Sequence, residues 1–247
     1  MQSVAAIIQA RMSSSRLPGK VLMPISGMPL IGHVLHRVSR AKTVSEVVLA
    51  TSSDTSDDPL ARWAEGSGHR VFRGDLTDVL ERFAGAASSL NSSAIVRITG
   101  DCPLIDPEVI DNVVSTFFSQ NCDYASNAIV RSYPRGLDVE AMRNKVLQSI
   151  RALRTLTDYQ REHVTPYIYQ NRDSFSIVDV IAPDALNKPD WRWCVDEAAD
   201  FDFVSRVFQG LYDENPEFRS SAIFELIARN PEILKVNQSV QQKAPCL

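Results

Sequence analysis

Short apolar runs alternate with helix-like patterns along the first half of the chain. Runs rich in β-branched residues predict strands, and the segments between them carry apolar residues every three or four positions, which predicts helices. The predicted strands cover residues 4–8, 46–51, 69–73 and 94–99, and the predicted helices cover about 30–38, 58–66, 79–87 and 106–117. This alternation is typical of a Rossmann-like α/β fold, in which helices flank a mostly parallel sheet.

Local signals mark where several of these helices begin. Asp58 and Asp106 each precede a proline, and this pair is typical of a helix start, with the aspartate as the cap. Asp158 is expected to cap a later helix, and Pro166 is expected to interrupt it, because proline cannot continue the helical hydrogen bonding.

The second half of the chain has a less regular pattern. Residues 136–142 alternate like a strand within a small lobe, roughly residues 123–172, which we expect to bind an acceptor and to contribute to a dimer. Further strands are predicted over 175–181 and 191–196, and a helix is predicted over 201–211. A polar tail, residues 236–247, is expected to be mobile, so that residues 1–235 form a single domain.

Composition narrows the possible partners. The chain has 247 residues, 44% of them hydrophobic, which is enough for one main core. Its formal net charge of -4 argues against a nucleic-acid partner. No apolar run approaches the roughly 20 residues of a membrane span, and no signal segment precedes the first strand. We therefore expect a cytoplasmic protein that binds neither nucleic acid nor membrane.

A basic loop follows the first predicted strand. Residues 11–20 read Arg-Met-Ser-Ser-Ser-Arg-Leu-Pro-Gly-Lys, which places Arg11, Arg16 and Lys20 at the carboxyl end of that strand. Open α/β sheets bind their ligands at this edge. Guanidinium forks, an ammonium and accessible backbone N–H groups suit a triphosphate, although a solvated basic turn remains the alternative.

The Gly19-Lys20 pair also occurs in Walker loops of NTPases. In this chain, however, Ser14 stands where the Walker motif has its first glycine, and Val21 stands where it has serine or threonine. We therefore exclude a Walker NTPase.

An aspartate follows the fourth predicted strand. Asp101 stands beside Gly100, which is expected to let a ligand come close, and its carboxylate could hold a hard cation against phosphates. An aspartate after a strand is more often a cap or a turn residue. That interpretation holds for Asp106, because Pro107 follows it.

Two segments of the basic loop resemble a known family. Ile7-Ile-Gln-Ala-Arg11 and Ser15-Arg-Leu-Pro-Gly-Lys20 resemble the start of the cytidylyltransferases that make CMP-activated sugar acids, especially the spore coat polysaccharide biosynthesis protein F group. CMP-KDO and CMP-acylneuraminate synthetases are wider relatives. Gln9 stands where many of these wider relatives carry proline, which leaves the acceptor sugar open. The resemblance extends to about residue 210.

The resemblance implies a reaction, a cofactor and roles for named residues. It implies that CTP and a sugar acid give a CMP-sugar and pyrophosphate, with Mg²⁺ as cofactor and a homodimer as the assembly. Asp101 and Asp196 would bind the magnesium, although Asp196 alone would be interpreted as a helix cap. The implied catalytic residues are Arg11, Lys20, Asp101 and Asp196. The implied nucleotide-binding residues are Ala10, Arg11, Ser15, Arg16, Lys20, Thr51, Arg73 and Asp101. The implied sugar-binding residues are Asn127, Arg135, Asp138 and His163.

Three other functions stay open at this point. A nucleotide-sugar-dependent glycosyltransferase uses a similar α/β unit with an acidic pair, but it does not need such a basic loop. A nucleotidyltransferase could use another NTP or another acceptor. A nucleotide sensor without catalysis would keep the loop and tolerate the loss of Asp101 and Asp196.

Overall fold

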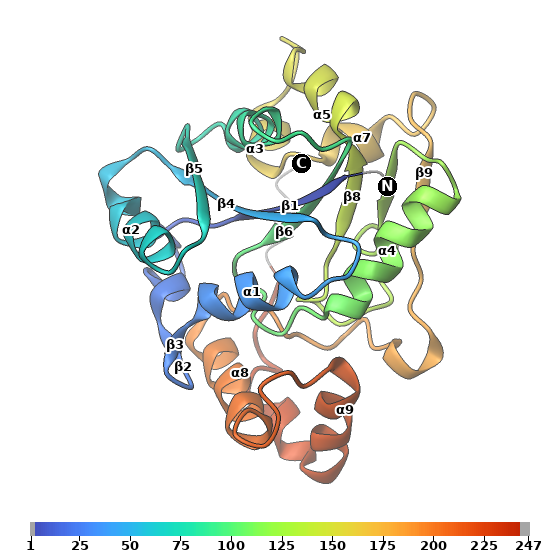
Figure 1. Cartoon of the computed structure of the whole chain (residues 1–247). Coiled ribbons are helices and arrows are strands. Elements are labelled where there is room, and N and C mark those ends of the chain that lie inside the picture. The colour runs from blue at the N-terminus through green and yellow to red at the C-terminus, as the bar shows by residue number, and fades with distance from the viewer. Residues whose placement is uncertain (1–2, 243–247) are drawn as a thin grey trace.

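A seven-stranded sheet forms the centre of the computed structural model, which describes residues 3–242 (Figure 1). The strands follow the order β5-β4-β1-β6-β8-β7-β9. Their bounds are β1 Val4–Gln9, β4 Glu46–Ser52, β5 Arg70–Gly74, β6 Ala94–Thr99, β7 Tyr124–Ser126, β8 Glu140–Arg143 and β9 Ile177–Asp179. Strands β5, β4, β1 and β6 are parallel, whereas β8 runs antiparallel to β6 and β7. The predicted mostly parallel α/β sheet is confirmed.

Helices cover both faces of the sheet (Figure 1). One face carries α1 Leu30–Ser39, α2 Asp58–Gly66, α4 Pro107–Ser119, α8 Ala198–Leu211 and α9 Ser220–Arg229. The other face carries α3 Val79–Ser88, α5 Asn144–Arg151 and α7 Pro166–Gln170, and α6 Asp158–His163 packs beside α3. The small elements are the β2–β3 pair, Pro24–Ile25 and Met28–Pro29, and the 3-10 turns η1 Lys20–Leu22, η2 Thr55–Asp57, η3 Asp184–Leu186 and η4 Pro231–Lys235.

The central strand β1 shows why its sequence is an unbroken apolar run. Val4, Ala6 and Ile8 belong to the core under α1 and α4, whereas Ala5 and Ile7 belong to the core under α3. A parallel strand that is covered on both faces has no solvent side and therefore no need for alternating polar residues. The carboxyl ends of β1 and β6 are thereby fixed next to each other.

The strand predicted over residues 136–142 begins only at Glu140. Before Glu140, the backbone hydrogen-bonds to the side chain of Asn127 and not to a neighbouring strand. Nδ2 of Asn127 donates to the carbonyl of Leu137, and its Oδ1 accepts from the N–H of Val139, each at 2.8 Å. The predicted strand over 175–181 is likewise reduced to β9.

The prediction of a strand over residues 191–196 is wrong. Only an isolated bridge joins Arg192 to Arg135, because the backbone N–H groups of this segment find different partners. The N–H of Trp193 donates to the carbonyl of Arg135 at 2.7 Å, and the N–H of Val195 donates to that of Asp101 at 2.8 Å. Asp196 therefore does not follow a strand, and the second contact brings it beside Asp101.

Asp106 is a helix cap as predicted, since its carboxylate accepts from the N–H of Glu108 at 2.9 Å. Asp58 and Asp158 are not caps, because the N-cap positions belong to Asp57 and Thr157. Thr157 accepts from the N–H of Gln160 in a capping box, which leaves Asp158 in the first turn. The expected interruption at Pro166 is confirmed by the break between α6 and α7.

The expected polar tail begins as a packed segment. Asn237 has only 4% of its surface exposed, and its Nδ2 donates to the carbonyl of Arg192 at 2.9 Å. Residues 243–247, the end of the expected tail, lie outside the described residues. The polar sequence around Asn237 predicted exposure to solvent, and it could not reveal this contact with a distant segment.

Candidate active site

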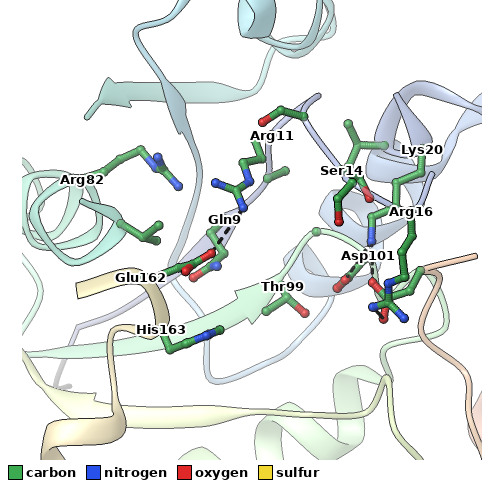
Figure 2. A pocket seen from close by; sticks show the side chains of 17 residues that line it. Gln9, Arg11, Ser14, Arg16, Lys20, Arg82, Thr99, Asp101, Glu162 and His163 are labelled. Carbon is green, nitrogen blue, oxygen red and sulfur yellow. Dashed lines mark hydrogen bonds and ion pairs between the residues drawn. The ribbon is translucent and has the colours of Figure 1, made fainter. Parts of the chain in front are cut away.

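A cavity of about 390 Å³ opens at the carboxyl ends of β1 and β6 (Figure 2). Gln9 and Ala10 line it from β1 and the residue after it, and Thr99, Gly100 and Asp101 line it from the end of β6. The basic loop after β1 forms another wall with Arg11, Ser13, Ser14, Ser15, Arg16 and Lys20. The loop therefore lies where parallel sheets bind ligands, as its sequence predicted.

Backbone hydrogen bonds fold the basic loop back on itself. The carbonyl of Met12 accepts from the N–H groups of Ser14 and Gly19, each at 2.9 Å. Gly19 has a φ of 73°, in the left-handed region that favours glycine. The N–H of Met12 donates to the buried carboxylate of Asp57 at 2.6 Å, which ties the loop to the end of β4.

Gly100 lines the cavity, and it also has a structural role that was not expected from the sequence. A Cβ at this position would lie 2.7 Å from Cβ of Ala10 and 3.0 Å from the carbonyl oxygen of Gln9. The glycine therefore permits close approach between the ends of β1 and β6, because protein atoms occupy the space that a side chain would need.

Lys20 lies between two carboxylates. Its Nζ is 3.2 Å from Oδ2 of Asp101 and 2.9 Å from Oδ1 of Asp196, and it donates to the carbonyl of Val195 at 2.6 Å. Burial alone lowers the pKa of the Lys20 ammonium, but the two carboxylates raise this pKa above its ordinary value. The position between Asp101 and Asp196 therefore stabilises a cation.

Asp196 is held by three cations. Its Oδ1 faces Lys20, and its Oδ2 accepts from Nη2 of Arg16 at 2.8 Å and from Nη2 of Arg192 at 2.6 Å. Burial alone raises the pKa of the Asp196 carboxyl, but Lys20, Arg16 and Arg192 together hold this pKa below its ordinary value. Asp196 is thus an ionised carboxylate that faces the cavity, and its side chain does not cap α8.

The two carboxylates have the donor chemistry of a magnesium site. Mg²⁺ commonly uses one or two carboxylates and takes its remaining ligands from water and phosphate. Residues 3–242 contain no group of three or more histidine, cysteine or acidic side chains suited to a metal. A metal at Asp101 and Asp196 would therefore need further oxygen ligands from water or from a bound phosphate group.

Several residues that line the same cavity were not predicted as site residues, and the polar ones among them include Gln9, Arg82 and Glu162. Arg82 is only 3% exposed and donates to the carbonyls of Asp75 and Leu76, while its Nε has no hydrogen-bond partner within residues 3–242. The sequence did contain a signal for Arg82, because it lies three positions after Val79 and therefore on the apolar, buried face of α3. A cation on such a stripe points into a buried space.

Glu162 closes the opposite side of the cavity. Nη2 of Arg11 lies 3.5 Å from its carboxylate, so the two side chains meet across the opening (Figure 2). His163 follows on the same helix and faces the cavity, and burial lowers its pKa below the ordinary value of 6.5. His163 is therefore a neutral hydrogen-bonding group near neutral pH.

Two residues predicted to contact nucleotide do not line this cavity. Arg73 pairs with Asp58 at 2.7 Å and donates to the carbonyl of Ser52 at 2.8 Å, which directs its guanidinium toward α2. Thr51 is fully buried, and its Oγ1 has no hydrogen-bond partner within residues 3–242.

A second cavity of about 460 Å³ adjoins the first and shares Thr99 and His163 with it. Its charged residues are paired: Arg97 with Glu140, and Arg131 with Asp138 through two hydrogen bonds of 2.7 and 3.0 Å. The other residues that line it are Ala128, Ile129, Tyr159, Thr165, Tyr169 and Gln242.

Of the four predicted sugar-binding residues, two line this second cavity and two do not. Asp138 and His163 line it, whereas Asn127 is fully buried in its contacts with the backbone of residues 137–139. Arg135 is half-buried and does not line the cavity, although it lies near Arg131 and Asp138, which do. It has no ion pair within residues 3–242. Burial, followed by the nearby positive charge of Arg131, lowers the pKa of Arg135.

The basic loop, the paired carboxylates and the mostly parallel sheet together define a nucleotidyltransferase. Residues 5–218 match the family model described as cytidylyltransferase. The spore coat polysaccharide biosynthesis protein SpsF of Bacillus subtilis is 34% identical over 236 residues, covering 94% of this chain and 97% of that protein. The chain therefore belongs to the cytidylyltransferase family, whose members use CTP.

Solved structures agree with this assignment. A cytidylyltransferase from Leptospira borgpetersenii superposes with a TM-score of 0.89 at 30% identity, covering 99% of this chain and 100% of that one. A structure of CMP:2-keto-3-deoxy-manno-octonic acid synthetase complexed with CTP gives a TM-score of 0.65 at 22% identity, covering 85% and 99%. At that identity the second likeness supports the fold alone.

The helices offer no candidate for a membrane span. Within residues 3–242, none combines the length and the apolar composition that a crossing of the bilayer requires.

Proposed function

We propose that this enzyme transfers the cytidylyl group of CTP to a hydroxyl of a sugar acid and releases pyrophosphate. The hydroxyl oxygen bonds to the α-phosphorus, the bond from that phosphorus to the bridging oxygen of the β-phosphate breaks, and the hydroxyl proton passes to water. The product would serve the synthesis of a surface polysaccharide, as the name of the Bacillus relative suggests.

The charge balance of the first cavity carries this proposal. Four cations line it, Arg11, Arg16, Lys20 and Arg82, against the three carboxylates of Asp101, Glu162 and Asp196. Three of these cations are paired with carboxylates of the same cavity. Asp101 and Asp196 would hold a metal in place of these cations, and Lys20 and Arg16 would then be free to bind the phosphates.

Each group then has a role that follows from its chemistry. Arg11, Arg16 and Lys20 would bind the β- and γ-phosphates, and Arg82 would neutralise a further phosphate oxygen. Mg²⁺, when bound, stabilises charge on the phosphate oxygens and lowers the pKa of the attacking hydroxyl. Asp101 and Asp196 hold that ion, and the loop and the sheet edge align the reactants, so most of the catalysis is positioning and electrostatics.

The second cavity is the proposed acceptor site. Its position beside the first cavity, with Thr99 and His163 lining both, would put an acceptor hydroxyl next to the triphosphate. Neutral His163 is suited to hydrogen-bond a sugar hydroxyl. Arg135 is the nearby guanidinium without a carboxylate partner within residues 3–242, so a sugar carboxylate would supply its missing counter-ion.

The proposed function is tested by measuring pyrophosphate release with CTP and a panel of sugar acids, each paired with its neutral counterpart. We expect release with at least one acid, and much less with its neutral counterpart or with UTP. Release that depends on a neutral sugar and ignores the carboxylate would contradict the proposed acceptor class.

Arg135→Lys and His163→Ala should affect the sugar acid and leave CTP binding nearly unchanged. Lysine keeps the charge of Arg135 but cannot make the paired contact with a carboxylate, so we expect the KM for the sugar acid to rise about tenfold. Steady-state kinetics with each substrate varied in turn measures this. Lys145→Ala, on α5, is the control. An equal loss for CTP would assign these residues to the nucleotide site.

A further inference from the structure

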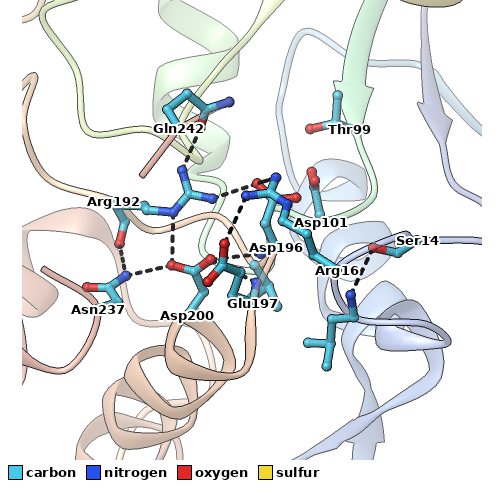
Figure 3. Close-up of polar contacts among 12 residues, drawn as sticks. Ser14, Arg16, Thr99, Asp101, Arg192, Asp196, Glu197, Asp200, Asn237 and Gln242 are labelled. Atoms are coloured by element: carbon cyan, nitrogen blue, oxygen red, sulfur yellow. Dashed lines mark hydrogen bonds and ion pairs between the residues drawn. The ribbon is translucent and has the colours of Figure 1, made fainter. Parts of the chain in front are cut away.

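The C-terminal segment of the described chain contacts the candidate active site, although it lies after the residues that the family model matches. The family model ends at residue 218, whereas residues 236–242 pack against the segment that carries Asp196 (Figure 3). Asn237 is almost fully buried there. This segment is therefore built into the site, although its sequence looks like a solvated tail.

Arg192 is the centre of this contact, and its side chain is only 7% exposed. Its guanidinium donates in three directions: Nε to Oδ1 of Asp200 at 2.9 Å, Nη1 to Oε1 of Gln242 at 2.5 Å, and Nη2 to Oδ2 of Asp196 at 2.6 Å (Figure 3). One planar group thus connects the start of α8, the C-terminal segment and the carboxylate that faces the cavity.

Asp200 anchors one side of Arg192. Its side chain is fully buried, and its Oδ2 accepts from the N–H groups of Asp196 and Glu197 at 2.9 and 3.0 Å. Its Oδ1 accepts from Arg192 and also from Nδ2 of Asn237 at 3.0 Å. The backbone of Asp196 and the guanidinium that holds its side chain are therefore fixed by the same carboxylate.

Gln242 connects this network to the second cavity. Its side chain lines that cavity while its Oε1 accepts from Arg192, which in turn holds Asp196. Without Gln242, one Nη group of Arg192 would lose its only acceptor within residues 3–242. The guanidinium could then turn away from the geometry that it imposes on Asp196.

We propose that Arg192 is a positioning residue for the Asp196 carboxylate, and that Gln242 from the C-terminal segment completes its alignment. This rests on the proposed function, in which Asp196 binds the metal of the metal–CTP complex. Arginine is required because a planar guanidinium can donate along three fixed directions, whereas an ammonium cannot reproduce that fork.

The test measures Mn²⁺ binding to the full-length enzyme in the presence of CTP by electron paramagnetic resonance, and it needs no acceptor. Gln242→Ala should weaken this binding about tenfold, since it removes a hydrogen bond to a charged group. Arg192→Lys should weaken it at least as much. Gln242→Glu keeps an oxygen at the same position and should restore it.

The matched control is Gln241→Ala, because Gln241 is exposed like Gln242 but makes no hydrogen bond within residues 3–242. It should bind Mn²⁺ like the wild type, and the melting temperature of Gln242→Ala should stay within about 3 °C of the wild type. A Gln242→Ala enzyme that behaves like Gln241→Ala, or a Gln242→Glu enzyme that is not restored, overturns the inference. A wild type that binds Mn²⁺ no better with CTP than without it would instead contradict the proposed function.

Discussion

Asp101→Asn and Asp196→Asn should each lower kcat by about three orders of magnitude, which corresponds to about 4 kcal/mol of lost transition-state stabilisation. Each substitution removes one of the two carboxylates that lie around Lys20. Asparagine can still accept a hydrogen bond from Lys20, but it lacks the negative charge that holds a divalent ion. Steady-state pyrophosphate release at saturating magnesium measures the loss.

Asp190→Asn is the control, because Asp190 is exposed and forms no ion pair within residues 3–242. It should retain wild-type activity. Circular dichroism should show that both active-site variants keep their secondary structure. If either variant kept more than about a tenth of wild-type turnover, its carboxylate would not be a ligand of the proposed metal, since one order of magnitude is only about 1.4 kcal/mol.

Lys20→Ala should weaken CTP binding by about 1.5 to 3 kcal/mol, the range for losing a hydrogen bond to a charged group. Lys20 is only 7% exposed, and its ammonium lies between Asp101 and Asp196, so a metal bound by both carboxylates would have to displace it. Without CTP, Lys20→Met should therefore bind Mn²⁺ more tightly than the wild type, because two carboxylates are left without their shared counter-ion.

Calorimetric titration with CTP and a separate titration with Mn²⁺ measure the two effects. Lys42→Ala removes an exposed lysine and should change neither affinity. An unchanged affinity of Lys20→Ala for CTP would remove Lys20 from the triphosphate site. Weaker Mn²⁺ binding by Lys20→Met would show that the ammonium does not compete with the metal.

The parallel half of the sheet could be predicted because the pattern that identifies each strand lies within the residues of that strand. A strand covered on both faces is an apolar run, and β1, β4 and β6 follow that rule closely enough to be found from the sequence. The edge strand β5 has no buried residue and was found from its position in the alternation of strands and helices. The loop after β1 could be placed for the same reason, since it directly follows such a run. These elements bring Arg11, Arg16, Lys20 and Asp101 into one cavity.

The segment around Asp196 could not be predicted in the same way. Its alternating Trp191 and Trp193 pack against α9, which gives a strand-like pattern, while its backbone bonds to two separate loops. A periodic pattern reports which side chains are buried and does not identify the partner of the backbone. Asp196 nevertheless lies beside Asp101, as the family resemblance implied, and the Val195 hydrogen bond brings it there.

The second cavity depends on contacts between distant parts of the chain. Arg131 pairs with Asp138 there, whereas Arg135 remains without an ion-pair partner within residues 3–242, and nothing in the residue types distinguishes the two arginines beforehand. Gln242 comes from a segment whose composition predicts only solvation. In both cases a single tertiary contact decides the role, and local sequence does not encode it.

A crystal structure with Mn²⁺ and a CTP analogue that cannot be cleaved at the α-phosphorus tests the central claim most directly. We expect an anomalous peak from Mn²⁺ between Asp101 and Asp196, with the Nζ of Lys20 moved from those carboxylates to the phosphates. A triphosphate bound in the first cavity while Lys20 still bridges both aspartates, and Mn²⁺ elsewhere, would contradict it.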